Sequence, residues 1–235
     1  MSNFAVMPIS DYENTCNAIR EKTGSTEPIK SGDMAAKIPE VYNKGKADEN
    51  KEFWDTFQDN GARTKYAYAF YEWKGETISP IYDILCYGGA NYIYRAFYNS
   101  NVKRIEKPIR ISGNSAQGQP FTNASSLETI TLLDLTGFNN ALTDWFSNCN
   151  ALKNITIEGE IPQSINFKDS QLTPESMVSV ITHLKNYNGT SNAFAYEVKF
   201  TDSCWNLLNT STDIEKPTGY STWQEYVQDA FGWNV

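Results

Sequence analysis

The sequence predicts an α+β protein in four parts: a helical N-terminal arm, an aromatic-rich cap, a short β-solenoid and an α/β C-terminal cap. One short phrase recurs three times at a fixed interval, the chain before it favours helix, and the chain after it carries a well-capped helix. A fixed period of this length is typical of a solenoid, whose coils bury their apolar sides only against neighbouring coils. The parts are expected at residues 1–60, 61–95, 96–170 and 171–235.

The repeated phrase begins with a phenylalanine, at Phe97, Phe121 and Phe146, and each copy has an asparagine two positions later. Asparagine suits a tight corner, because its amide can satisfy backbone groups that the turn leaves open. The first copy is one residue shorter than the others. The aliphatic positions recur every 25 residues, at Val102, Leu127 and Leu152 and at Ile105, Ile130 and Ile155. The alternative is that the three copies are similar by chance and belong to an ordinary three-stranded sheet.

Each copy ends in a strand signal. Apolar residues alternate at Ile130 and Leu132, and again at Ile155 and Ile157, as a strand with one buried face requires. The side chains that this alternation turns outward are predicted to form a binding face. They are Lys103, Arg104, Glu128, Thr129, Thr131, Lys153, Asn154 and Thr156.

The phrase resembles the BspA-type leucine-rich repeats, whose copies carry an Ala-Phe-x-x-Cys-x-x-Leu-x-x-Ile core. Ala96, Phe97 and Cys149 stand at matching positions. The resemblance implies a short, curved, leucine-rich-repeat-like solenoid that binds other molecules without catalysis. The chain departs from the family in its few copies and its irregular spacers, such as residues 112–120.

Residues 1–60 predict a helical arm. Ser10 and Glu13 form a capping-box pattern at the start of an amphipathic helix expected over residues 11–23. Residues 40–58 are also helix-permissive, but their apolar stripe is interrupted in the middle. This last segment suits either a helix that runs along a partner chain or a surface helix packed only at its aromatic end.

The arm also carries a resemblance of its own, in four short phrases. They are Met7-Pro-Ile-Ser-Asp-Tyr, Ile19-Arg-Glu-Lys-Thr-Gly, Ile29-Lys-Ser-Gly-Asp-Met and Phe53-Trp-Asp-x-Phe-Gln-x-Asn-Gly61. These phrases resemble a module at the start of tail and fibre-like proteins of phages that infect Gram-positive gut bacteria, and of their prophages. In those proteins the module is an attachment segment. The resemblance implies that residues 1–60 hold other virion proteins and that the protein is located on the virion.

Residues 61–95 are rich in aromatic side chains, and Tyr66, Tyr68 and Phe70 alternate as in a strand. Rings of this kind suit a recognition surface, because they offer a large contact area with few rotatable bonds. They also suit a cap on the open end of a solenoid, which must be covered. We favour the cap.

The C-terminal part begins with the clearest helix of the chain. Thr173 is its expected cap, Pro174 stands in its first turn, and one apolar face extends to Leu184. The pattern beyond it predicts a strand, two short helices and a final strand, at residues 196–200, 202–208, 221–231 and 232–235. This unit is interpreted as a terminal cap, and its order resembles the ends of the same phage-associated proteins.

Composition excludes several classes of function. The net charge of the 235 residues is −8, which argues against non-specific binding to nucleic acid or anionic membranes. No run approaches the roughly 18–20 apolar residues of a membrane span. The N-terminus lacks the basic start and apolar run of a signal peptide. Neither nucleic acid nor a membrane is therefore a predicted partner.

No pattern of catalytic or metal-binding residues stands out. Cys16, Cys86, Cys149 and Cys204 are scattered and are expected to be buried thiols of a protein made in a reducing compartment. The chain has one histidine, His183, and no serine or cysteine lies in a motif typical of a catalytic nucleophile that this histidine could activate. The sequence predicts no metal, no cofactor and no histidine-dependent catalysis. Carboxylates are plentiful, so a pair suited to glycoside hydrolysis is left open.

These observations favour a non-enzymatic phage virion protein: a tail fibre, a baseplate component or another surface appendage. Its residues 1–60 would attach it, and its repeats would bind a glycan or protein of the host surface. Fibre symmetry favours a homotrimer. The alternatives are a bacterial cell-surface adhesin of the BspA type, which requires export, a polysaccharide-degrading appendage, and a head or collar decoration protein.

Overall fold

The computed structural model describes residues 70, 72, 77–78, 84–87, 93–112 and 118–235. All of them belong to a compact unit that extends from residue 57 to residue 235. The helices expected in the N-terminal arm lie outside the described residues, as does most of the aromatic block. The predictions for both segments therefore stay predictions.

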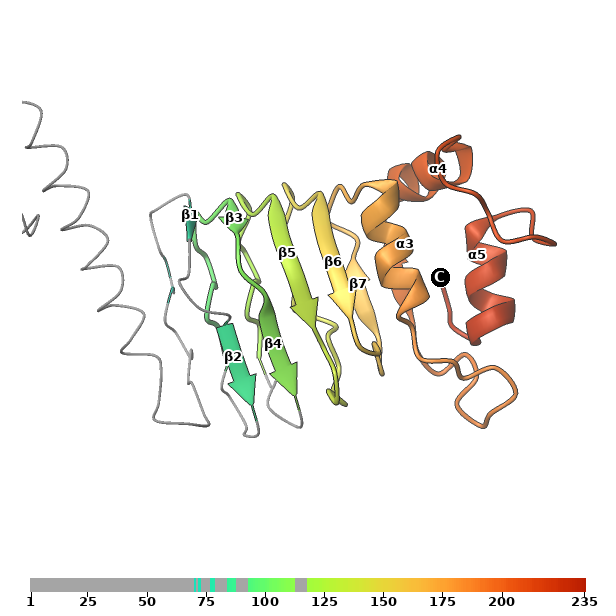
Figure 1. The fold of residues 1–235 in the computed structure, drawn as a ribbon, viewed down its shortest axis with the longest axis horizontal. Coiled ribbons are helices and arrows are strands. Elements are labelled where there is room, and N and C mark those ends of the chain that lie inside the picture. Colours follow the sequence, from blue (N-terminus) through green and yellow to red (C-terminus); the bar gives the residue numbers. More distant parts are fainter. Residues whose placement is uncertain (1–69, 71, 73–76, 79–83, 88–92, 113–117) are drawn as a thin grey trace, which may run out of the picture. The chain divides into compact units, whose positions relative to one another are not determined.

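A parallel sheet of short strands forms the body of this unit (Figure 1). Its strand order is β1-β3-β5-β4-β2, and β6 pairs with the free side of β5. The strands are β1 (Thr77–Ile78), β2 (Ile84–Tyr87), β3 (Arg104–Ile105), β4 (Ile109–Ser112), β5 (Thr129–Asp134) and β6 (Asn154–Glu158). Because β5 pairs with both β3 and β4, one coil contributes two short strands where the next contributes one long strand.

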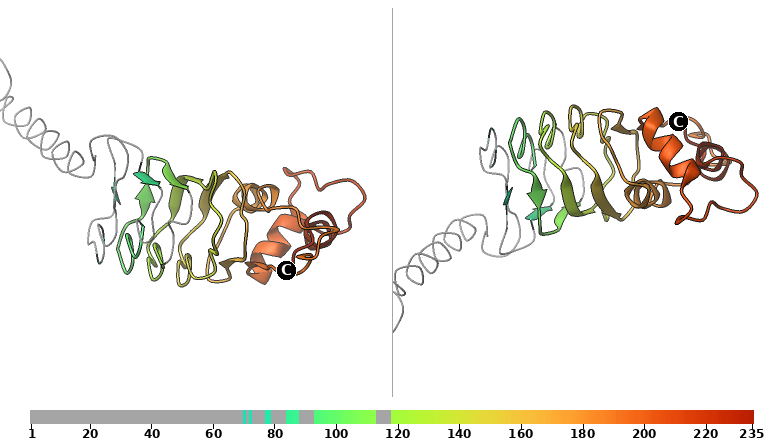
Figure 2. Two further views of the ribbon diagram at one scale, coloured as in Figure 1. Left: turned by 90° about the horizontal axis from the view of Figure 1, so that it is seen from below. Right: turned by 90° about the horizontal axis from the view of Figure 1, so that it is seen from above.

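The 25-residue interval of the sequence is the step from one strand to the next. Ile105 lies opposite Ile130, and Ile130 lies opposite Ile155, all in parallel register. All three side chains are buried. Each coil therefore places the same apolar position against its neighbour. Figure 2 shows the strands of successive coils side by side from two directions.

A ladder of phenylalanine rings fills the interior beside the sheet. Neighbouring ring centroids are 4.6–5.8 Å apart, and the rings are within 23° of parallel. Stacked aromatic pairs of this kind add about 0.5–1.5 kcal/mol each beyond the burial of their surface. The rings, in order, are Phe70, Phe97, Phe121, Phe146, Phe167 and Phe200. The last of them, Phe200, belongs to the C-terminal cap, so the coils and the cap share one core.

The asparagine of each copy occupies a left-handed corner, as its residue type predicts. The φ angles of Asn99, Asn123 and Asn148 are 55°, 62° and 60°. Asparagine tolerates this region better than most residues with a Cβ. The corners are joined between coils, because Asn148 Nδ2 donates to Asn123 Oδ1 at 2.7 Å and the Asn123 amide donates to the Ser147 carbonyl at 2.9 Å.

The expected alternation is wrong in β5 and right in β6. The register of β5 shifts between Ile130 and Leu133, so Leu133 is buried where Leu132 was expected and Leu132 is only half-buried. A bulge of this kind places one extra residue in a strand and moves the later side chains to the other face. In β6, Ile155 and Ile157 are buried between exposed neighbours.

The C-terminal cap holds the three expected helices. Each begins after a threonine whose hydroxyl accepts a backbone amide of the first turn: Thr173, Thr201 and Thr222. The helices are α3 (Pro174–Thr182), α4 (Asp202–Thr210) and α5 (Trp223–Tyr226), and α5 continues as the wider helix η2 (Val227–Phe231). A second parallel sheet pairs β7 (Ile165–Phe167) with β8 (Val198–Phe200).

The strand expected at residues 232–235 is not formed. One bridge between Glu197 and Asn234 is present instead. Gly232 ends η2 with a φ of 71°, and this left-handed turn redirects the chain before an extended segment can develop. The segment still covers the edge of β8, because the Val198 amide donates to the Asn234 carbonyl at 3.0 Å.

Helix α3 covers the free edge of β6 (Figure 1). The amides of Ile155 and Ile157 point away from β5 and donate to Ser176 Oγ at 3.0 Å and to Ser179 Oγ at 2.9 Å. Unpaired strand edges invite further strands, so this contact ends the sheet. Two serine hydroxyls thus take the place of the next strand.

Candidate binding surfaces

The eight residues predicted to form a binding face lie on or directly before β3, β5 and β6. Lys103 and Thr129 are half-buried and the other six are exposed. Parallel register aligns Arg104, Thr129 and Asn154 in one row across the strands. We call this solvent-facing side of β3 to β6 the outer face. Arg104, Thr129, Thr131, Asn154 and Thr156 lie on its strands, and Lys103, Glu128 and Lys153 directly precede them. The role of all eight in binding stays a prediction.

A second row on the outer face is charged. Parallel register aligns Arg110, Asp134 and Glu158 across β4, β5 and β6. Arg110 Nη1 lies 2.5 Å from Asp134 Oδ2 and 3.8 Å from Glu158 Oε2. Sequence reasoning missed this row, although each member directly follows a buried aliphatic residue and the spacing of 24 residues nearly repeats the period.

Opposing influences act on the carboxyl group of Asp134. Burial disfavours its charged form, but hydrogen bonds from Thr136 and the guanidinium of Arg110 outweigh that effect, so its pKa lies below the usual value. The Thr136 amide donates to Asp134 Oδ1 at 2.9 Å. The carboxylate therefore remains ionised and fixes Arg110 on the outer face.

The outer face meets α3 in a polar groove of about 400 Å³. Thr131, Asn154 and Thr156 line it from the strands, and Glu175 and Ser179 line it from the helix. The lining offers hydroxyl, amide and carboxylate groups. Because Ser179 Oγ already accepts an amide proton from β6, its own proton remains available for donation.

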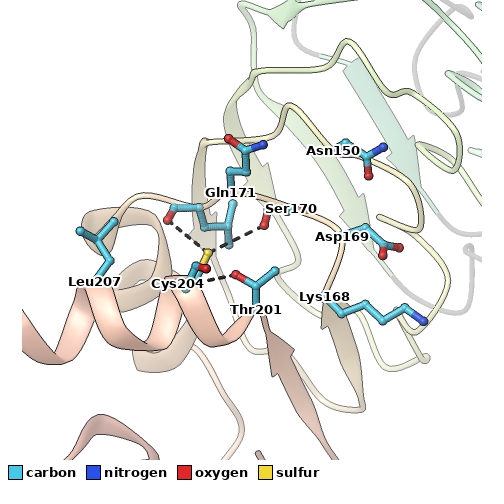
Figure 3. Close-up of a pocket in the computed structure, with 10 residues that line it drawn as sticks. Asn150, Lys168, Asp169, Ser170, Gln171, Thr201, Cys204 and Leu207 are labelled. Atoms are coloured by element: carbon cyan, nitrogen blue, oxygen red, sulfur yellow. Dashed lines mark hydrogen bonds between the residues drawn. The ribbon is translucent and has the colours of Figure 1, made fainter.

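A larger cavity of about 690 Å³ lies between the turn after β7 and α4 (Figure 3). Lys168 and Asp169 line the turn side, and Thr201 and Cys204 line the helix side. Asp169 already holds the coil before it, since its Oδ2 accepts the Asn148 amide at 3.0 Å. We assign no binding role to this cavity.

The described thiols are suited to packing rather than chemistry. Cys149 and Cys204 are buried and free, as predicted. Burial raises the pKa of the Cys149 thiol to about 12, and its Sγ lies 3.1 Å from the Phe121 carbonyl. The Cys204 Sγ lies 3.8 Å from the Ser170 carbonyl oxygen, as Figure 3 shows. A thiol with a raised pKa, like that of Cys149, is a poor nucleophile. Cys16 and the side chain of Cys86 are outside the described residues.

His183 stands at the C-terminal end of α3 and contacts its own helix. Its Nδ1 lies 2.7 Å from the Ser179 carbonyl oxygen and 3.4 Å from Thr182 Oγ1. Within the described ranges, no three His, Cys, Asp or Glu residues gather closely enough to hold a metal ion. The helices of the described segments are too short and too polar to cross a bilayer.

No protein-family model, curated protein or solved structure matches this chain. Its function must therefore be argued from its own sequence and geometry.

Proposed function

We propose that this chain is a non-enzymatic phage virion protein, located in a tail fibre, baseplate or other surface appendage, and that it recognises its target through the outer face. Its coils form a short leucine-rich-repeat-like solenoid. The observation that carries the proposal is the alignment of outward polar side chains in rows across a parallel sheet. Such rows give a broad surface of hydrogen-bonding groups with fixed spacing.

The rigidity of the outer face supports a role in binding. The inward side chains of the same strands, such as Ile130 and Ile155, are buried, and the rings of the phenylalanine ladder are stacked in the same core. The edge of the sheet is closed by Ser176 and Ser179. A surface that is already ordered loses little conformational entropy when it binds, which favours affinity.

The arm of residues 1–60 provides the attachment. Its likeness to the leading module of phage tail and fibre-like proteins supports a contact with other virion proteins. In this proposal the arm joins the particle, the protein assembles as a homotrimer, and the outer face meets a glycan or protein of the host surface. No metal or cofactor takes part.

The location of the protein tests this proposal. Antibodies to the full chain should label purified phage particles, and deletion of residues 1–60 should release the protein from them. Retention of the truncated protein on particles would contradict the role of the arm. Labelling of the bacterial envelope, with none on particles, would instead support a cell-surface adhesin.

A further inference from the structure

The loop between α3 and β8, residues 186–196, exposes an aromatic ring. Phe194 is 52% exposed, and among the described aromatic residues it is the one that is neither buried nor half-buried. Its backbone is also unusual, with a φ of 61°. A left-handed conformation is unfavourable for bulky residues, because their Cβ crowds the following carbonyl oxygen. The loop thus holds an apolar ring in water on a strained backbone.

The strained residue is fixed on both sides. The Phe194 amide donates to the Gly232 carbonyl at 2.5 Å, and Asn234 Nδ2 donates to the Phe194 carbonyl at 2.7 Å. The Ala195 amide donates to the Asn192 carbonyl at 3.0 Å, which closes the turn around the ring. Phe194 is therefore held in one backbone conformation.

The start of the loop is docked just as closely. Asn188 Nδ2 donates to the Asp229 carbonyl at 2.6 Å. A Cβ added to Gly232 would lie 2.9 Å from the Asn188 amide nitrogen, closer than real Cβ atoms come. Glycine is thus required at residue 232 both for its φ and for this close approach.

Aromatic side chains pack together at the two ends of the loop. The ring centroids of Tyr187 and Tyr196 are 4.9 Å apart, and the Tyr196 and Trp233 centroids are 5.8 Å apart. Tyr187 donates its hydroxyl proton to the Pro162 carbonyl at 2.7 Å, and Trp233 Nε1 donates to the Lys185 carbonyl at 2.8 Å. The two loop ends are therefore anchored to the body of the cap.

The chemistry around the ring points to one class of partner. Residues 186–196 contain no charged side chain, in a chain of which 20% is charged. Thr190, Ser191 and Asn192 are exposed near the ring in sequence, and the side chains of Ser191 and Asn192 make no hydrogen bond within the described part of the chain. An exposed apolar ring, with a neutral amide two residues before it and a neutral hydroxyl three residues before it, matches a neutral ligand that has both an apolar face and hydroxyl groups.

We propose that the loop at residues 186–196 is a saccharide-binding site, in which Phe194 stacks on the C–H face of a neutral sugar. The negative face of an aromatic ring attracts the weakly positive C–H hydrogens of a pyranose, and Ser191 and Asn192 supply hydrogen bonds to its hydroxyls. The absence of charge in the loop disfavours anionic sugars. The polar neighbours disfavour an apolar protein pocket, which would leave them unpaired. This site is separate from the outer face and does not depend on where the protein is located.

An array of neutral and anionic oligosaccharides, probed with the full-length protein, tests the proposal. Phe194→Asn is the decisive variant, because asparagine accepts the left-handed backbone and should leave the melting temperature unchanged or higher. Leu207→Asn is the matched control, since Leu207 is 51% exposed on α4. Phe194→Trp keeps a stacking ring and should retain binding.

The expected result is binding to one or more neutral oligosaccharides that falls at least about tenfold in Phe194→Asn and less than about twofold in Leu207→Asn. The proposal is overturned if the wild-type protein binds no neutral oligosaccharide, if it binds only anionic ones, or if Phe194→Asn binds as well as wild type. Capture of a host protein without any saccharide binding would also overturn it. If Phe194→Asn melts at a lower temperature, Phe194→Ser with the same readout replaces it.

Discussion

The coils and the C-terminal cap share one ladder of phenylalanine rings, but they place different residue types at backbone positions with a left-handed conformation. In the three copies of the repeated phrase these positions are filled by Asn99, Asn123 and Asn148, and asparagine suits them; before the first copy, Glu72 and Arg95 also have positive φ angles, of 54° and 49°. In the cap, Phe194 occupies such a position with its ring half in solvent. In the three copies, the residue type suits the corner that stacking repeats from coil to coil. Among the described non-glycine residues with a positive φ, Phe194 is the one with an aromatic side chain.

The largest expected effect lies in the middle of the ladder. Phe121 is fully buried between the rings of Phe97 and Phe146, whereas Phe200 is 7% exposed at the end and meets Trp205 edge-on. Phe121→Ala should lower the free energy of unfolding by about 3–5 kcal/mol, and Phe200→Ala should lower it by less. Urea denaturation measures both. Equal losses would show that the coils and the cap do not differ in packing.

The contact between α3 and the sheet comes next. Ser176→Ala should lower the free energy of unfolding by about 1–3 kcal/mol, because the buried Ile155 amide loses its acceptor. Ser179 is half-buried, so water can partly replace it and Ser179→Ala should have a smaller effect. Ser191→Ala is a control on an exposed loop. If all three variants unfold at the same urea concentration, the serine hydroxyls of α3 do not stabilise the edge of β6.

Because Asn123 lies in a left-handed corner, alanine and glycine at this position should affect stability differently. Asn123 has a φ of 62° and accepts a hydrogen bond from the Asn148 amide group. Asn123→Ala should lower the free energy of unfolding by about 1–2 kcal/mol, because alanine is strained in this conformation. Asn123→Gly loses the same side-chain contact without the strain and should be less harmful. If glycine destabilises more than alanine, the side-chain contact matters more than the backbone.

The charged row predicts a small dependence on pH. The pKa of Asp134 is lower in the folded chain than its usual value, so its stabilising contribution is present above that usual value, near pH 4, and is lost as the pH falls through the folded pKa. The contribution is about 1 kcal/mol or less, since Arg110 is partly exposed. Asp134→Asn should therefore reduce stability at pH 7 and have less effect at pH 3. A difference that is the same at both pH values would contradict this.

The period of the sequence predicted where the strands lie, because stacking transmits one spacing from coil to coil. It did not predict that Phe167 and Phe200 extend the ladder, since they follow their predecessors by 21 and 33 residues instead of 25. The 33-residue step contains α3, which interrupts the period. Leu132 was expected to be buried, but Leu133 is buried instead. Because both positions hold leucine, the apolar pattern does not indicate the bulge between them.

The candidate surfaces were predictable to different degrees. Alternation alone located Thr131, Asn154 and Thr156, since a strand shows every second residue to solvent. The groove beside them depends on where α3 docks, and the paired serines that dock it have no local signal. The exposure of Phe194 was equally hidden, because it is set by hydrogen bonds to Gly232 and Asn234 on a distant segment.

Binding of the full-length protein to host cells tests the central claim, that the outer face is a recognition surface, most directly. The double variant Asn154→Arg and Thr156→Arg should melt like wild type but bind at least about tenfold more weakly. Thr143→Arg, an exposed substitution outside β3 to β6, should bind like wild type. Equal binding by the double variant and the wild-type protein would show that the outer face is not the recognition surface.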